Sequence, residues 1–117
     1  MKVNNLPKDV LQSLLFNHTM KINLKKFGTI LTSRQAGKES LLAFRPTLNE
    51  AKETEEIEVD FEGVNSFSPS WGDEFLTPLY DTYGDRLFLT HTQENPSVVV
   101  TLDLLDKLEG KKFRTLS

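Results

Sequence analysis

The chain has 117 residues, a formal net charge of −3 and a pI of about 5.4. That length suits one domain with its own hydrophobic core, and 38% hydrophobic and 26% charged residues are typical of a folded chain rather than a disordered one. The acidic balance gives no overall basic surface for nucleic acid. Because cysteine is absent, disulfides, thiol nucleophiles and cysteine-containing zinc sites are excluded.

The sequence shows no sign of targeting to a membrane. Residues 1–10 include Pro7, Lys8 and Asp9 and lack the apolar core of a signal peptide. No apolar run approaches the roughly 20 residues that cross a bilayer. We therefore expect a cytoplasmic protein that binds neither membrane nor nucleic acid.

The N-terminal segment, residues 1–19, is predicted to be a helical extension that Pro7 can begin. Its apolar residues fall on one face of a short helix: Val10, Leu11, Leu14 and Leu15. That face either packs on the domain or contacts a second copy or a partner, since amphipathicity alone does not identify what covers it. We expect a monomer or a weak homodimer, with residues 6–16 as the contact in a dimer.

Residues 20–110 carry the patterns of strands and helices in alternation, as one domain. Alternating apolar residues predict strands at 20–24, 29–31, 57–61 and 86–91. The first two are short and close together, so we expect them to pair as a hairpin with its loop at 25–28.

Three helices are predicted between and after these strands. Their N-terminal signals are Thr32 with Gln35 in a capping box, Ser68 before Pro69, and Asn95 before Pro96. Pro46 and Pro78 fall inside the first two helices, where we expect a kink or an end. The order β-β-α-β-α-β-α predicts an α/β domain, with a mixed sheet of about four strands and helices packed on it.

Apolar residues at helical spacing predict which helix faces are buried. Trp71 and Phe75 are expected to lie between the second helix and the sheet. The third helix, which ends at Gly110, is expected to bury Val98, Leu102, Leu105 and Leu108. Residues 111–117 are predicted to form a basic tail.

The central strand carries acidic residues on one face. Glu58, Asp60 and Glu62 share that face by their period of two. This predicts either that the face is partly open to water or that the strand lies near an edge of the sheet. Such a charge run is more typical of a wet surface than of a metal site, because a metal needs carboxylates that converge in a fixed cage.

The run at residues 59–75 reads V-D-F-E-G-V-N-S-F-S-P-S-W-G-D-E-F. It resembles the hallmark segment of the STAS-like domains of unknown function, which are bacterial relatives of the anti-sigma-factor antagonists. The resemblance implies a STAS-like sandwich over residues 20–110. In the antagonists, a partner kinase phosphorylates a serine in an Asp-Ser-Ser-Gly run. When residues 68–71 are aligned with that run, Ser70 matches the phosphoacceptor. Ser68 takes the place of the aspartate, and Trp71 takes that of the glycine.

Motifs of several enzyme classes are missing: the Walker phosphate loop, the Rossmann glycine fingerprint and the G-x-S-x-G elbow. His18 and His91 have no cysteine or third histidine to complete a common zinc set. We interpret His91 as a surface or loop residue rather than a base, since no activated nucleophile pairs with it in the sequence. We therefore expect no enzyme activity, no cofactor and no bound metal.

Three hypotheses of function remain. In the first, the chain is a non-enzymatic STAS-like interaction module that docks a protein partner, an anti-sigma-type ATPase kinase by the resemblance; its candidate partner-binding or phosphoacceptor residues are Ser68, Ser70, Asp60 and Asp73. In the second, the helix N-terminus at 68–70 binds a small anion or a nucleotide. In the third, Asp60, Asp73 or Glu74 serves a hydrolase, which requires that these carboxylates converge in one cleft with raised pKa values.

Overall fold

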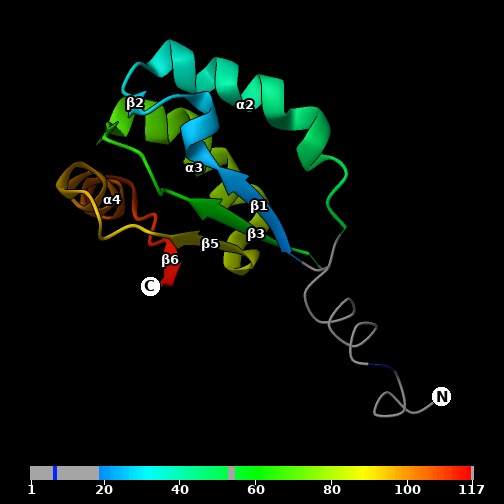
Figure 1. Ribbon diagram of the computed structural model, residues 1–117. Helices are drawn as coiled ribbons and strands as arrows, with labels where there is room; N and C mark the ends of the chain where they lie inside the picture. The colour runs from blue at the N-terminus through cyan, green and yellow to red at the C-terminus, as the bar shows by residue number, and fades with distance from the viewer. Residues whose placement is uncertain (1–6, 8–18, 53–54, 117) are drawn as a thin grey trace.

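The computed structural model describes residue 7 and residues 19–52 and 55–116 (Figure 1). The elements in chain order are β1 (Thr19–Asn23), the 3-10 helix η2 (Leu24–Phe27), β2 (Ile30–Leu31), α2 (Arg34–Leu48), β3 (Glu56–Asp60), β4 (Ser66–Phe67), α3 (Pro69–Tyr83), the 3-10 helix η3 (Gly84–Arg86), β5 (Leu87–Thr90), α4 (Pro96–Glu109) and β6 (Arg114–Leu116). The predicted N-terminal helix and its contact face at 6–16 fall outside the described residues, apart from Pro7 and Thr19. None of the helices in the described part is both long and apolar enough to cross a bilayer.

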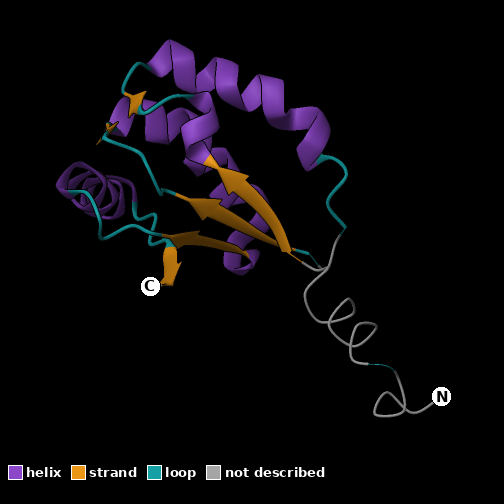
Figure 2. Ribbon diagram, in the orientation of Figure 1, coloured by secondary structure: helices purple, strands orange, loops and turns teal. Residues whose placement is uncertain are grey.

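Four strands form one sheet in the order β1-β3-β5-β6, and β2 and β4 form a separate pair (Figure 2). Together with α2, α3 and α4, this confirms the predicted α/β class. All the pairs are parallel, so the sheet is not mixed. The predicted hairpin is wrong, because β1 pairs with β3 and β2 pairs with β4. The reason is η2, which buries Leu24 in the core and leads the chain out of the sheet before β2 begins.

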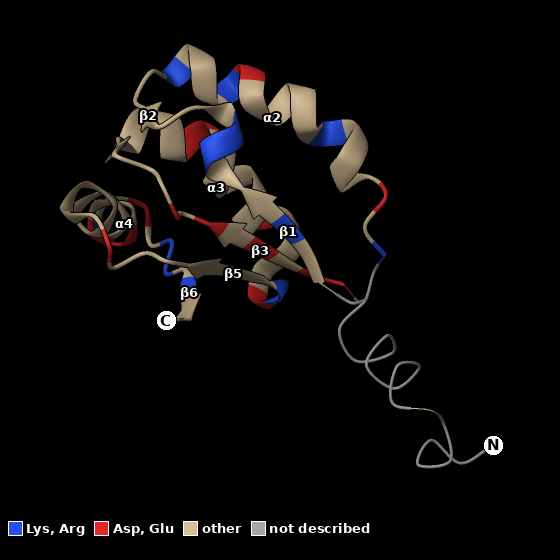
Figure 3. Ribbon diagram, in the orientation of Figure 1, with Lys and Arg blue, Asp and Glu red and all other residues tan. Residues whose placement is uncertain are grey.

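The strand order gives the two faces of the sheet different environments. Parallel strands that follow one another in a single direction place their connecting helices on one face, because such crossovers are right-handed. Apolar residues that are fully buried line that face: Ile22, Ile57, Val59 and Leu89. The opposite face carries charged residues side by side, including Lys21 and Glu58, which are partners in the register of β1 and β3 (Figure 3).

This arrangement decides between the two expectations for the acidic strand. β3 lies between β1 and β5, so the expectation of a position near an edge is wrong. Glu58 is half-buried and Glu62 is exposed, which agrees with a partly open face. Asp60 differs from both, because only 1% of its surface is exposed.

An aromatic cluster forms the core between the helices. Trp71 and Phe75 are 1% and 0% exposed, which confirms their predicted burial, and their rings stack with centroids 4.8 Å apart. Helix α2 packs closely on this part of α3 at Gly37. A Cβ atom at residue 37 would lie 2.8 Å from the Trp71 carbonyl oxygen, so the close approach depends on glycine.

The predicted helix starts are confirmed at Ser68 and Asn95 and shifted at α2. Ser33, not Thr32, is the N-cap of α2, and its hydroxyl accepts from the Ala36 amide at 3.0 Å. Gln35 therefore does not complete a capping box; its side chain donates to Glu39 instead. Pro46 and Pro78 lie inside α2 and α3, which continue past them to Leu48 and Tyr83, so neither ends its helix at the proline.

Two expectations for the C-terminal region are corrected. Val98 and Leu105 are buried as predicted and Leu102 is half-buried, but Leu108 is 74% exposed, and Thr101 is buried on this face of α4. Arg114–Leu116 forms β6 beside β5, so part of the segment predicted as a basic tail belongs to the sheet.

Candidate functional site

The Ser70 corner, residues 68–70, joins β4 to the start of α3. Ser68 is the N-cap of α3: its hydroxyl accepts from the Trp71 amide at 3.4 Å and donates to the Thr32 carbonyl at 2.6 Å. Ser68 therefore ties α3 to the end of β2, and its hydroxyl is fully used. Of the two candidate serines, Ser70 is the one that remains available to a partner.

Helix α4 holds this corner in place through β4. The Ser97 and Thr101 hydroxyls both donate to the Phe67 carbonyl, at 2.9 and 2.6 Å, and the Phe67 amide donates to Ser97 at 2.9 Å. Gly72 permits the close packing, since a Cβ there would lie 2.9 Å from the Phe67 ring and 3.2 Å from Leu105. The start of α3 is thus fixed against α4.

Ser70 is half-buried and lines a pocket of about 230 Å³ between α3 and α4. The other residues around the pocket are Arg34, Pro69, Asp73, Leu105, Leu108 and Glu109. The structure therefore brings Ser70 and Asp73, two of the candidates, into one hollow. It also adds residues from α2 and α4 that the sequence did not connect with this site.

The charges beside Ser70 are mainly negative. Arg34 donates to Asp73 at 3.0 Å and to Glu74 at 2.9 Å, so its guanidinium is already shared by two carboxylates. Arg34 holds the pKa of Asp73 below its usual value. Burial and the neighbouring Asp73 raise the pKa of Glu109, as expected where acidic groups crowd together.

A stripe of exposed apolar residues runs along α4 beside this pocket. Val100, Leu104 and Leu108 are 57%, 37% and 74% exposed. Their spacing of four residues places them on one face of the helix. We call these three residues the α4 stripe. Because Leu108 also lines the Ser70 pocket, the stripe and the corner form one continuous surface.

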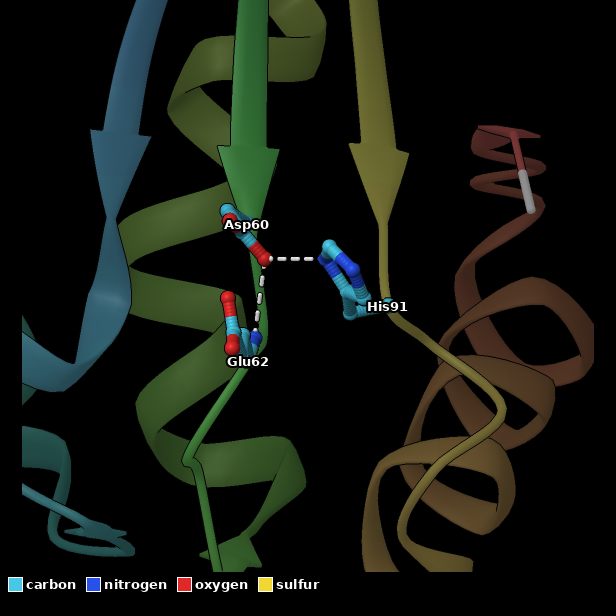
Figure 4. A group of neighbouring side chains, drawn as sticks. All are labelled: Asp60, Glu62 and His91. Carbon is cyan, nitrogen blue, oxygen red and sulfur yellow. Dashed lines mark hydrogen bonds and ion pairs between the residues drawn. The ribbon is translucent and has the colours of Figure 1, made fainter.

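Asp60 belongs to a different part of the molecule, at the carboxyl end of β3. Its Oδ1 atom accepts from the Glu62 amide at 2.9 Å and lies 2.7 Å from His91 Nδ1 (Figure 4). Its Oδ2 atom lies 3.2 Å from Lys21 Nζ. Within the described residues, no hydrogen bond or ion pair joins Asp60 to the Ser70 corner.

His91 was interpreted from the sequence as a surface residue, and the structure gives it a defined partner. It follows β5 with a φ of 54°, the only positive φ of a described non-glycine residue. This uncommon conformation brings its ring to Asp60. The signal that could have revealed the pair is the parallel sheet, because the carboxyl ends of neighbouring parallel strands lie at the same edge.

The electrostatics of the pair follow from its burial and its contacts. Burial alone raises the pKa of Asp60, but the Glu62 amide, His91 and Lys21 outweigh it and hold that pKa below its usual value. The Asp60 carboxylate in turn raises the pKa values of His91 and Lys21. Asp60 is therefore a carboxylate at neutral pH, surrounded by groups that favour its charge.

The hydrolase hypothesis requires Asp60, Asp73 and Glu74 to converge in one cleft with raised pKa values. The structure does not meet this condition. Asp60 contacts His91 and Lys21, whereas Asp73 and Glu74 share Arg34. The pKa values of both aspartates are lowered rather than raised.

A separate cavity of about 390 Å³ lies beside His91, lined also by Thr92, Gln93, Glu94, Thr115 and Leu116.

Comparison with known proteins agrees with this fold. The family model described as a STAS-like domain of unknown function matches residues 44–98. This confirms the resemblance that the run at 59–75 carries, and the match includes both the Ser70 corner and the Asp60–His91 pair. No match was found among curated proteins or among solved structures.

Proposed function

We propose that this chain, whose residues 44–98 match a STAS-like domain, is a non-enzymatic protein-interaction module that docks a partner across the Ser70 corner and the α4 stripe. The observation that carries the proposal is the exposure of the stripe next to the corner. Leu108 is 74% exposed and yet lines the pocket that contains Ser70. A partner that covers Ser70 therefore also covers apolar surface.

The stripe supports docking because exposed apolar side chains gathered on one face are typical of interaction surfaces. Scattered apolar residues would not carry the argument, since they are common on any protein. Here, three of them share one side of α4, and polar groups line the pocket at the Leu108 end of the stripe: Arg34, Ser70, Asp73 and Glu109. An apolar centre with a polar margin is the usual composition of a protein interface.

An anti-sigma-type ATPase kinase is the partner class that the family resemblance suggests. Ser70 matches the phosphoacceptor of the antagonists, and its half-buried hydroxyl makes no hydrogen bond with another described residue. Phosphate on Ser70 would add a charge of about −1.5 to −2 beside Asp73 and Glu109. We propose that such a charge weakens docking, because the one guanidinium of the pocket is already paired.

The same charges argue against the alternative of an anion or nucleotide sensor. A helix N-terminus attracts anions through its free amides and its dipole. At α3, however, Asp73, Glu74 and Glu109 surround the single cation Arg34. Their repulsion opposes a free phosphate, whereas an apolar protein surface is not affected in the same way.

The test begins with a candidate partner, an ATPase of the anti-sigma kinase class, which is sought among the neighbouring genes. Titration calorimetry of the purified pair would give Kd for the wild type and for Leu108→Gln. We expect Leu108→Gln to weaken binding about tenfold or more, since burying a leucine side chain is worth about 1.5–3 kcal/mol and about 1.4 kcal/mol corresponds to a factor of ten. Leu42→Gln is the matched control, because Leu42 is a 61% exposed leucine on α2.

Equal Kd values for the wild type and both variants would contradict docking through the α4 stripe. Equal losses in both variants would point to a general apolar effect and would also count against it. Thermal melts check that both variants remain folded. Titration with ATP and with inorganic phosphate tests the sensor alternative, and saturable binding that Ser70→Asp abolishes would favour that alternative instead.

A further inference from the structure

Three metal-ligating side chains converge at the edge of the sheet where the parallel strands end. Asp60 is the last residue of β3, Glu62 follows two residues later, and His91 follows β5. The His91 ring reaches Asp60 from the neighbouring strand, and the Glu62 carboxylate points back toward Asp60 (Figure 4). Each residue offers one ligand atom, and these three atoms lie within 4.8 Å of one another.

Asp60 is the buried member of this cluster. The residue is only 1% exposed, and its Oδ2 atom has no hydrogen-bond partner among the described residues. Lys21 Nζ lies 3.2 Å from Oδ2 as an ion pair, and the Lys21 side chain is 50% exposed, so one ammonium reaches this oxygen from the solvent side. A buried carboxylate is stabilised by donors and cations. A metal ion bound to the carboxylate would supply a second cation for this buried charge.

We propose that Asp60, Glu62 and His91 bind a divalent transition-metal ion, and that zinc is the ion they fit best. One imidazole and two carboxylates belong to the ligand types that zinc takes in proteins, and three protein ligands leave a fourth position for water. The two carboxylates balance the double charge of the ion. This site is independent of the Ser70 corner and goes beyond the interaction proposed above.

The distances require a movement of the side chains. Zinc lies about 2.0–2.2 Å from nitrogen and oxygen ligands in a tetrahedron, so its ligand atoms are about 3.3–3.6 Å apart. A spread of up to 4.8 Å must therefore shrink by a little over 1 Å. The exposed Glu62 side chain can make that movement. The Oδ1–Nδ1 contact of 2.7 Å would open to about 3.3 Å around a tetrahedral ion.

Lys21 allows a more specific test, because its ammonium and the metal ion would both neutralise the Asp60 carboxylate. Asp60 and Glu58 both raise the pKa of Lys21, so the lysine is charged at neutral pH. Its positive charge therefore opposes a second cation at Asp60. Replacing Lys21 with an uncharged residue should tighten metal binding, an effect that adventitious binding to surface acids would not show.

The experiment uses the full chain, without an affinity tag and treated with a chelator. Titration calorimetry with Zn²⁺ should show saturable binding of one ion per chain, and Co²⁺ should give the visible absorption of a bound ion. His91→Asn and Glu62→Gln should each weaken binding at least about tenfold, since even second-shell partners of a metal are worth that much. Asparagine is chosen because it tolerates the positive φ of residue 91.

Two further variants complete the test. Lys21→Met should tighten binding several-fold by removing a neighbouring positive charge. Glu94→Gln is the matched control: Glu94 is 58% exposed and 4.0 Å from His91 Nε2, but outside the proposed ligand set. It should weaken binding far less than Glu62→Gln does, because it removes only a neighbouring charge and not a ligand. Circular dichroism confirms that each variant is folded, so a loss reports on the ligands.

The proposal is overturned if the wild type shows no saturable binding, or if folded His91→Asn binds as well as the wild type. A loss in Glu94→Gln without a loss in Glu62→Gln would overturn the proposed ligand set, because the ion would then lie on the Nε2 side of the ring. An affinity that does not change in Lys21→Met would count against contact between the ion and Asp60.

Discussion

His91 Nδ1 lies 2.7 Å from Asp60 Oδ1, and this contact joins the ends of β5 and β3. His91 reaches it with a φ of 54°, a conformation that non-glycine residues seldom adopt. The contact therefore holds the start of the β5–α4 connection in a strained backbone geometry, beside the cavity that His91 and Glu94 line.

The first prediction concerns the pH dependence of this contact. Because Asp60 raises the pKa of His91, the stabilisation from His91 is complete below its unfolded pKa of about 6.5 and is lost as the pH rises through the folded value. The pKa of Asp60 is lowered, so its contribution is present above an unfolded pKa of about 3.9 and is lost as the pH falls through the folded value. Both contributions are present between those two unfolded values.

The measurement is urea unfolding of the wild type and His91→Asn with a chelator present. The difference in the free energy of unfolding should be larger at about pH 5.5 than at about pH 9, since His91 has lost its proton at the higher value. The same difference at both pH values would show that the Asp60 contact does not depend on the charge of His91.

The second prediction concerns the core. Trp71 is 1% exposed and packs against Phe67 and Phe75, so Trp71→Ala should lower the free energy of unfolding by about 3–5 kcal/mol. Chemical denaturation measures the loss. Leu42→Ala is the control, because Leu42 is 61% exposed and its replacement should change stability by less than about 0.5 kcal/mol. Similar losses in both variants would contradict this packing.

The third prediction concerns Gly37, where alanine should destabilise the protein instead of stabilising the helix. Replacing a helical glycine with alanine usually stabilises a helix by about 0.5–1 kcal/mol. Gly37→Ala should instead destabilise by about 1–3 kcal/mol, because its Cβ would lie 2.8 Å from the Trp71 carbonyl oxygen and 3.1 Å from the Trp71 Cα, both of them backbone atoms. Ala43→Gly, at an exposed position of the same helix, should cost the usual amount. A stabilised Gly37→Ala would show that α2 and α3 can separate slightly.

The N-cap residues and the apolar spacing predict the helices well, because both depend on residues that are close together in the sequence. Ser68 and Asn95 are N-caps as expected, and each accepts from a backbone amide within its own first turn. Trp71 and Phe75 follow the spacing of a helix with one buried face. The caps and the apolar period depend on residues two to four positions apart, so short stretches of sequence reveal most of them; the N-cap of α2 and Leu108 are the exceptions.

Strand pairing and the candidate sites depend on residues far apart in the chain. A short loop at 25–28 favoured a hairpin, but the pairing of Ile22 with Val59 is decided by burial of both against the helices. Leu108 has the spacing of a buried residue, yet it is 74% exposed near the end of α4. His91 and Asp60 are 31 residues apart and meet only because β3 and β5 are parallel neighbours.

The last prediction separates the roles of the two serines at the corner. Ser68 caps α3 and binds the Thr32 carbonyl, so Ser68→Ala should cost about 1 kcal/mol or more of stability. The Ser70 hydroxyl makes no hydrogen bond with another described residue, so Ser70→Ala should leave stability nearly unchanged. Ser68, and not Ser70, is the N-cap of α3. Thermal and chemical melts of the two alanine variants test this difference directly.

Ser70→Asp then tests the interaction itself. It places a charge beside Asp73 and Glu109, whose repulsion acts within the roughly 8 Å screening length of physiological salt. We expect Ser70→Asp to stay folded and to lose affinity for the ATPase partner, while Ser70→Ala keeps it, because only the aspartate brings a charge that Arg34 is not free to neutralise. If both variants bind as the wild type does, Ser70 does not lie in the interface, and the α4 stripe alone would remain as the docking surface.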